Sequence, residues 1–547
     1  MAPERTARAA QVQGARSPRR GPRALAWPLL RVGANARQLL FVPPDPWPGN
    51  IAHGRRLLAM EEPLAWGAVA AGVPGNEAHR FAWLRDLRAV GGDAARQRCQ
   101  TLVKTWIADH GLAPERALWS PGMIADRLVH WIGQFDFFGK PAPQSFKAPF
   151  FRSMAHQARA LARAAPRIAA TPERVRALRA LISFGAAVPG AHARLDLAIG
   201  LLSPLVEAWP GHGLIPERDP SGQLAVLRDL IDIRAFLVAA HHETPPALEL
   251  AVARTARALA AMRHGDGGLA LFHGGAEEDP TFVDVVLALA GAEAVAPSRF
   301  SAGYERASGG DGVLLFDAAG PPPPGSDRFA HAGALAFEFS AGPARLIVNC
   351  GAYRGDDPAW RDAGRMTAAH STLVVSDRNS AEIVPGGGIG HRPGDIVVDR
   401  REDEGATWIA GTHDGYARRF AFLHRRRLFL AADGADLRGE DRLVPVAGRR
   451  IPRKALGAEF RIRFHLHPDV VVAAPEPAEA GGSAIPFGSS DSGPWRFIAE
   501  GGLAATVEDS FYLGRGGAPM RAKQIVLAGR IETEDGAEAR WAIKRMR

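Results

Sequence analysis

The sequence is poor in cysteine, in tyrosine and in long apolar runs. Its two cysteines, Cys99 and Cys350, are far apart, which excludes a disulfide framework and a cysteine zinc site but leaves the redox compartment open. No stretch of about 18 uncharged apolar residues occurs, so we expect no integral membrane segment. A chain of 547 residues predicts two or more domains, with a hydrophobic core large enough to fold without disulfides or a structural metal.

Basic residues are concentrated at the N-terminus. The net charge is +9, but residues 1–37 carry eight Arg and one Glu, so the other 510 residues carry a net charge of about +2. The Arg, Pro and Gly content predicts that residues 1–45 form a disordered basic arm. The sequence lacks the basic–aromatic pattern of a nucleic-acid reader, so we expect no nucleic-acid partner. "ALAWPLL" after "RRGPR" imitates a signal peptide, but Arg31 follows and no convincing cleavage site comes next.

The pattern is helical between about residues 46 and 300. "TPERVRALRALI" has Thr171 as a predicted N-cap and Pro172 at the first helical position, followed by apolar residues at helical spacing. "TPPALELAVARTARALAAM" repeats the same device. Turns rich in Gly and Pro separate such segments, which predicts a domain of stacked helical hairpins over residues 46–300.

The hydrophobic period changes near residue 300. "DAAGPPPPGSD" cannot be helical, and large apolar residues alternate with other residues from 335 to 339, which is typical of a half-buried strand. "RLIVN", "STLVVSD", "RRLFLAAD" and "KQIVLAGRI" continue the series. Many strands separated by turns predict a β-sandwich over residues 301–547. Segregated helical and β halves predict a cleft between two domains.

Motifs in both halves resemble one known family. They are "HAGALAFEFSAGPARLIVNCGAY", "RMTAAHSTLVVSD", "HDGYARRFAFLHRRRLFLAADGADLRGEDRL", "FRIRFHLHPDVVV", "WPGHGLIPERDPSGQLAVLRDL" and "RHGDGGLALFHGG". In this order, over roughly residues 60–535, the chain resembles the bacterial heparinase II/III family of polysaccharide lyases. The resemblance implies an incomplete (α/α) toroid followed by an antiparallel β-sandwich. It also implies an acidic, uronate-containing polysaccharide as partner and a place in the cell envelope or periplasm. The cytoplasm is the alternative, because no clear signal peptide is visible.

The chemistry implied by the resemblance is β-elimination. One group must neutralise the uronate carboxylate, a base must take the neighbouring proton, and an acid must protonate the leaving oxygen. Related lyases use Asn, His or Arg for the first role and share the others between Tyr and His. This chain departs from that pattern, because its four tyrosines all lie in the β half. Gly222 and Gln223 stand where a Tyr–His pair is often found.

The resemblance also implies a metal position. Zinc-bearing relatives tend to carry histidines and an aspartate here, whereas this chain has Phe329 in the place of one histidine and retains His331, Asn349 and His370. Two imidazoles and an amide oxygen make a weaker zinc site than two histidines with a carboxylate, because the anion is lost. The alternative interpretation is a buried His/Asn hydrogen-bond network at the strand ends.

The expected catalytic residues are His212, Arg218 and His331. His212 lies in a Gly-flanked loop before a helix, and Arg218 could bind a carboxylate through two hydrogen bonds. The alternative roles are a structural histidine and an ordinary ion pair near a helix start. The residues expected to contact substrate are Glu217, Arg365, His413 and Tyr416. For "HDGY", which holds the last two, the alternative is a β-hairpin with an Asp-Gly turn.

The sequence therefore predicts a polysaccharide lyase that acts by β-elimination, with zinc as a candidate cofactor. The rival prediction is a non-catalytic glycan-binding or exopolysaccharide-assembly protein on the same fold. A glycan hydrolase would need two carboxylates across the cleft, and Glu217 and Asp219 are too close in sequence to form a persuasive pair. The oligomeric state stays open.

Overall fold

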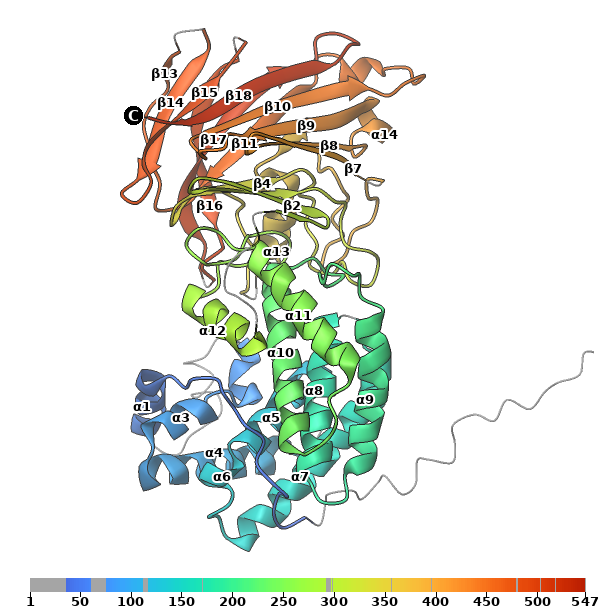
Figure 1. Cartoon of the computed structure of the whole chain (residues 1–547), viewed down its shortest axis with the longest axis vertical. Coiled ribbons are helices and arrows are strands. Elements are labelled where there is room, and N and C mark those ends of the chain that lie inside the picture. The colour runs from blue at the N-terminus through green and yellow to red at the C-terminus, as the bar shows by residue number, and fades with distance from the viewer. Residues whose placement is uncertain are drawn as a thin grey trace, which may run out of the picture.

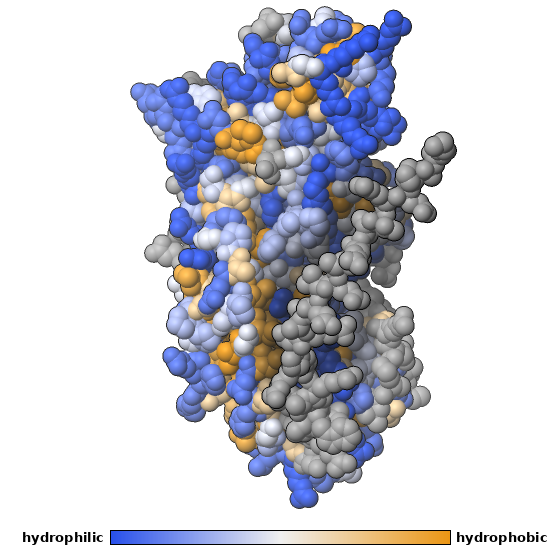
Figure 2. Space-filling model, turned by 90° about the vertical axis from the view of Figure 1, so that its right-hand side faces the viewer, coloured by the Kyte–Doolittle hydropathy of each residue, from blue (hydrophilic) through white to orange (hydrophobic). Residues whose placement is uncertain are grey.

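The computed structural model describes residues 36–60, 75–111, 117–169, 171–291, 297 and 299–546, except positions 356, 395, 479–480, 502 and 517. The molecule is elongated, with the helices at one end and the strands at the other (Figure 1). On the face drawn in Figure 2, hydrophilic residues predominate around the sheets, and a band of apolar residues runs down the middle of the helical half. No helix within the described ranges is long and apolar enough to cross a membrane.

The helical half is built around α8, which packs against α5, α9 and α10. Inner helices α8 and α10 are buried over most of their length, and α9 and α11 pack outside them. Asp219 caps α10 by accepting a hydrogen bond from the Ser221 backbone, with Pro220 at the first helical position. The helices are α1 (Ile51–Ala59), α3 (Leu84–Val90), α4 (Gly92–His110), α5 (Pro121–Gly133), α6 (Phe135–Phe138), α7 (Gln144–Ala164), α8 (Thr171–Ala187), α9 (His192–Glu207), α10 (Pro220–Ala239), α11 (Pro246–Ala261) and α12 (Pro280–Ala290).

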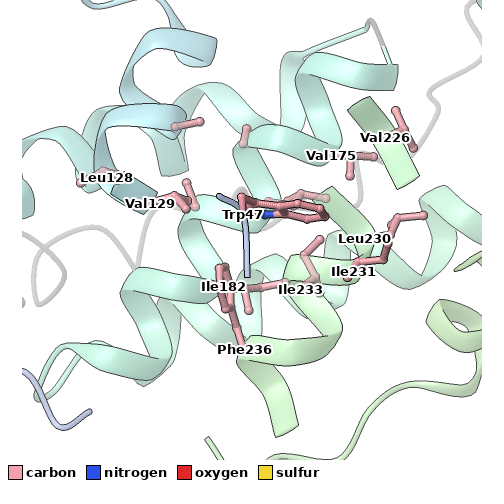
Figure 3. Close-up of a cluster of buried hydrophobic side chains, with 14 of the residues drawn as sticks. Trp47, Leu128, Val129, Val175, Ile182, Val226, Leu230, Ile231, Ile233 and Phe236 are labelled. Carbon is pink, nitrogen blue, oxygen red and sulfur yellow. The ribbon is translucent and has the colours of Figure 1, made fainter. Parts of the chain in front are cut away.

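A proline-rich N-terminal strap (residues 41–50, "FVPPDPWPGN") crosses the inner helices. Trp47 inserts its ring among apolar side chains that include Ile182, Ile233 and Phe236 (Figure 3). Its indole N–H donates to the carboxylate of Asp232 on α10 at 2.8 Å. The strap is therefore anchored in the core of the helical half.

The predicted disordered arm is too long at its C-terminal end. Residues 36–45, which the composition places in that arm, contain apolar side chains that pack against the helical core. The Leu40 backbone N–H also donates to the carbonyl of Ala187, the last residue of α8, at 2.8 Å. Local composition could not reveal these contacts, because the core that binds the segment lies far along the chain. Residues 1–35 lie outside the described residues.

The β half consists of two antiparallel sheets. In spatial order the first contains β1 (Phe300–Ser301), β2 (Tyr304–Gly309), β3 (Gly312–Asp317), β4 (Phe337–Ala341), β5 (Ala344–Val348), β11 (Glu459–Leu466), β17 (Met520–Arg530) and β16 (Ala505–Tyr512), with β6 (Leu373–Val375) beside β11. The second contains β12 (Val471–Val472), β14 (Ser483–Ser489), β15 (Gly493–Ala499), β18 (Ala537–Arg545), β10 (Asp436–Pro445), β9 (Phe422–Leu430), β8 (Ala406–His413) and β7 (Val397–Asp403), with β13 (Glu476–Pro477) beside β14.

Aromatic side chains join the two sheets into a sandwich. Phe337 of the first sheet stacks on Trp541 of the second with ring centres 5.4 Å apart, and Phe339 meets Trp495 edge to face at 5.5 Å. This arrangement confirms the predicted helical toroid followed by an antiparallel β-sandwich.

The two halves share a buried contact surface. The loop between α11 and α12 lies against β4 and β5, where Glu338 accepts hydrogen bonds from the His264 ring at 2.8 Å and from the Leu271 backbone. Tyr304 of β2 belongs to the same apolar core as the helices. The first sheet is therefore the part of the sandwich that positions a site against the helical half.

Candidate functional site

Three histidines meet where the first sheet faces the helical half. His331 comes from the loop before β4, His370 follows a short turn (Thr367–Ala369) before β6, and His273 comes from the loop between α11 and α12. The rings of His331 and His370 lie 2.9 Å apart between Nδ1 and Nε2, and the His331 backbone N–H donates to His273 Nδ1 at 3.1 Å. All three are buried. Gly333 permits this packing, because a Cβ at that position would lie 2.7 Å from the His370 ring.

The hydrogen-bond partners of each ring fix the tautomers of this cluster. His370 Nδ1 lies 2.8 Å from the Met366 carbonyl and must donate to it, so His370 Nε2 accepts. His331 Nδ1 therefore carries a proton and donates to His370. His331 Nε2 is then unprotonated, and its lone pair has no hydrogen-bond partner among the described residues. His273 accepts through Nδ1, which places its proton on Nε2, a buried atom that also lacks a partner.

Burial keeps the three imidazoles neutral. Desolvation lowers the pKa of His370 to about 4, although the Met366 carbonyl and Glu338 favour its protonated form. Burial, with smaller contributions from neighbouring His370 and His273, brings the pKa of His331 well below its usual range. Burial and then Arg218 do the same to the pKa of His273. At neutral pH the cluster offers one free acceptor, His331 Nε2, whereas the His273 Nε2–H is buried and lies 3.8 Å from Asp317 Oδ2.

Arg218 reaches the site but is already engaged. Its guanidinium donates to the carboxylate of Asp317 at the end of β3 and to the carbonyls of Gly303 and Gly320, and it stacks 4.4 Å from the centre of the Tyr304 ring. Burial opposes its charge, but Asp317 outweighs this and raises the pKa of Arg218. The expected two-pronged grip on a substrate carboxylate is absent from this arrangement, because both terminal nitrogens bind protein oxygens. Arg218 instead fastens α10 to the first sheet.

The donor set does not fit zinc. The Asn349 amide turns away from the two histidines: its Nδ2 donates to Glu338 at 2.9 Å, and its Oδ1 accepts from the Ser371 backbone at 2.9 Å. Within the described part of the chain, no three His, Cys, Asp or Glu side chains gather in a way that could hold a metal ion. His331 and His370 do meet, as the sequence predicts, but they form the alternative hydrogen-bond network rather than a ligand set with Asn349.

Three further residues that the sequence predicts to contact substrate are enclosed by protein in the structure. Arg365 is buried and donates to the carbonyls of Ala330, Val384 and Gly388. Tyr416 is buried and donates to the Leu373 carbonyl at 2.8 Å.

His413 lies in the second sheet, 3.1 Å from His424, with its other ring nitrogen occupied by the Gly415 backbone. These side chains are positioned by sheet and loop packing, to which short sequence motifs are blind.

The remaining expected residues lie near the helix starts. Glu217 accepts a hydrogen bond from the Thr171 backbone at 2.7 Å and so joins the start of α8 to the segment before α10. Burial raises the pKa of Glu217 despite that bond. His212 is exposed, and its Nδ1 accepts from the Leu214 backbone at 3.2 Å. The structure therefore brings together Arg218, His331 and His370, and leaves His212 outside the cluster.

The tyrosines give no obvious lyase base. The hydroxyl of Tyr304 donates to the Arg218 carbonyl, that of Tyr416 to Leu373, and that of Tyr512 to Glu277. Tyr353, in the loop after β5, is half-buried, and its hydroxyl makes no hydrogen bond to a described residue.

The sequence did not predict two residues of the site, His273 and Asp317. His273 stands in "FHGG", and its only signal was its place within a family-like motif.

Comparisons with known proteins agree with this architecture. Residues 297–542 match the heparinase II/III-like C-terminal domain, and the chain belongs to the heparinase II/III-like family. It is similar over nearly its whole length to FtsZ-localized protein C of Caulobacter vibrioides (strain NA1000 / CB15N), with 32% identity over 537 residues that cover 92% of this chain and 89% of the relative.

Solved structures share the fold at low sequence identity. The crystal structure of heparinase III superposes with a TM-score of 0.69 at 13% identity, covering 85% of this chain and 76% of that one. The heparan sulfate lyase HepC from Pedobacter heparinus superposes with a TM-score of 0.58 at 15% identity, covering 86% of this chain and 77% of the lyase. These likenesses show the fold.

Proposed function

We propose that this chain is a heparinase-fold protein that associates with FtsZ and does so without needing to cleave polysaccharide. The observation that carries the proposal is the extent of the similarity to FtsZ-localized protein C, which spans 92% of this chain and therefore includes the helical half that the family match to residues 297–542 leaves out. The engaged Arg218 and the hydrogen bonds that occupy the Asn349 amide support a role that does not depend on catalysis.

The test is localisation together with direct binding. A fluorescent fusion at the C-terminus is expected to concentrate where FtsZ assembles, and to disperse when FtsZ is depleted. Purified protein is expected to sediment with FtsZ polymers formed with GTP and to stay in solution with GDP. A signal that is unchanged by FtsZ depletion, with no co-sedimentation, would contradict the proposal. Digestion of the same fusion by protease added outside the inner membrane tests whether the protein lies in the cell envelope or periplasm, the location implied by the resemblance.

The second candidate is polysaccharide cleavage by β-elimination at the histidine cluster. It is favoured by the free lone pair of His331 Nε2. His331 would take the proton next to the uronate carboxylate, with its positive charge shared through the hydrogen bond to His370. The new carbon–carbon double bond would form as the bond to the 4-linked sugar breaks. The leaving oxygen would take a proton from water, and the hydroxide that remains would take the proton back from His331, which restores the free base.

Cleavage is tested by following the ultraviolet absorbance of the unsaturated product with a panel of uronate polysaccharides. If the candidate holds, His331→Gln lowers the rate by about 10²-fold or more, because proton transfer is lost. His192→Gln, a change at an exposed histidine at the start of α9, is the matched control and leaves the rate unchanged. Absence of product across the panel from folded protein would exclude the lyase and leave the FtsZ proposal standing.

A further inference from the structure

A cavity lies in the helical half, and none of its lining residues belongs to the histidine cluster. It has a volume of about 510 Å³. Its lining comes from the strap, from α3 and from the junction of α5 and α6, and includes Pro43, Pro44, Asp45, Trp47, Arg85, Arg88, Ala89, Gln134 and Asp136.

The cavity belongs to the helical half alone, because its lining residues all lie between positions 42 and 136. α5 and α8 begin side by side, since Gly122 lies next to Glu173, and α8 begins beside Glu217, close to the contact with the first sheet. Gly133 and Gln134 follow the other end of α5, and Leu40 is bonded to the other end of α8. The cavity is therefore a separate feature from the interface between the two halves.

The walls of this cavity are held in place before any ligand arrives. Asp45 of the strap accepts hydrogen bonds from Arg85 Nε and from Gln134 Nε2, each at 2.6 Å. Gly49 passes so close to α3 that a Cβ there would lie 2.3 Å from the Arg85 carbonyl oxygen. With Trp47 bonded to Asp232, the strap is pinned on both sides of the cavity. Such preorganisation lowers the entropic cost of binding.

The two arginines of the lining differ in what they have left to offer. Arg88 donates through both terminal nitrogens to Asp136, at 2.9 and 3.2 Å, and also contacts Gln134. Arg85 uses only Nε, and its terminal nitrogens make no hydrogen bond to a described residue. The Arg85 side chain is 13% exposed and lines the cavity. It therefore presents a charged edge with unused donors to this half-open cavity.

We propose that this cavity, beneath the strap, binds a small organic anion through Arg85. The free edge of a guanidinium matches a carboxylate or a phosphate in two parallel hydrogen bonds. Pro43, Pro44 and Trp47 offer apolar surface to the body of such a ligand, and the volume is that of a small-molecule site. The ligand class is a carboxylate or phosphate on a compact apolar or sugar-sized body.

Three probes of one shape separate charge from packing in the full-length protein. Benzoate and phenyl phosphate carry the two candidate anions, and benzamide is their neutral counterpart. Ligand-observed NMR titration is expected to show binding of at least one anion, with benzamide at least about tenfold weaker. The stronger of the two anions identifies the head group. Equal binding of benzamide, or no binding of either anion, would overturn the proposal.

Two variants and a control place the binding. Arg85→Lys keeps the charge but loses the fork, and is expected to weaken anion binding by about tenfold. Ala89→Leu fills the cavity without touching a hydrogen bond, and is expected to abolish binding even if Arg85→Lys proves unstable. Arg234→Gln is the matched control, because Arg234 of α10 pairs with Glu249 and does not line the cavity, and its binding should stay within about twofold of wild type. Wild-type binding by both Arg85→Lys and Ala89→Leu would refute the site.

Discussion

The protein contains two hydrogen-bonded histidine pairs that differ in how they end. His331 and His370 lie 2.9 Å apart at the contact between the halves, and His413 and His424 lie 3.1 Å apart within the second sheet. The pair in the second sheet continues to Asp441, so all its ring nitrogens have partners. The interface pair ends in the unpartnered Nε2 of His331. Proximity of imidazoles is therefore no sign of function by itself, and an unpaired nitrogen is the informative feature.

Replacing Asp441, the carboxylate at the end of the second-sheet pair, is expected to cause the largest loss of stability. Asp441 accepts from His424, Arg426 and Trp541, and all four side chains are buried. Asp441→Asn would leave the Arg426 charge uncompensated, at an expected cost of about 3–5 kcal/mol in the free energy of unfolding by urea. His331→Gln, at the open-ended pair, should cost much less. Equal losses for the two variants would erase the distinction between the pairs.

Acid should weaken the interface pair through His370. Burial holds its folded-state pKa at about 4, below the ordinary value of 6.5, so the unfolded chain binds more protons between these pH values. Stability is then full above pH 6.5 and falls as the pH drops toward 4, by about 3 kcal/mol from this residue alone. His370→Gln cannot titrate and should show a shallower decline in urea unfolding between pH 7 and pH 5. An unchanged pH slope would show that His370 is not held neutral.

The tautomers distinguish the pairs without any mutation. His331 and His370 should carry their protons on Nδ1, whereas His413 and His424 should carry theirs on Nε2, because His424 donates to Asp441 and His413 donates to His424. Nitrogen-15 NMR of labelled histidine reads these states directly at pH 7. A proton on His331 Nε2 would remove the free base on which the elimination candidate depends.

Added zinc should have the smallest effect on the stability of the protein. Because Asn349 is committed to Glu338 and Ser371, excess zinc is expected to shift the melting temperature by less than about 1 °C. Asn349→Asp should lower stability by placing a second carboxylate against Glu338, and zinc should not restore it. A large stabilisation of the wild-type protein by zinc would revive the metal prediction.

The sequence was informative where the signal is local. Thr171 and Pro172 predict the start of α8, which runs over Thr171–Ala187. The alternation of apolar residues near residue 337 predicts the strand β4. The meeting of His331 with His370 was also predictable, because both flank strands of one sheet. Their third neighbour, His273, comes from the helical half in a loop with no periodic pattern. The partner of Asn349 was hidden as well, since only the pairing of β4 with β5 brings Glu338 beside it.

One carboxylate makes the two halves thermodynamically inseparable. Glu338 is fully buried and is satisfied by His264 and Leu271 from one half and by Asn349 from the other. Pulling the halves apart would break the hydrogen bonds from His264 and Leu271 and expose apolar surface that the halves share, so unfolding of one half destabilises the other. A chain of two architectures should therefore melt in the calorimeter as one cooperative unit, with a single transition where its domain count suggests two.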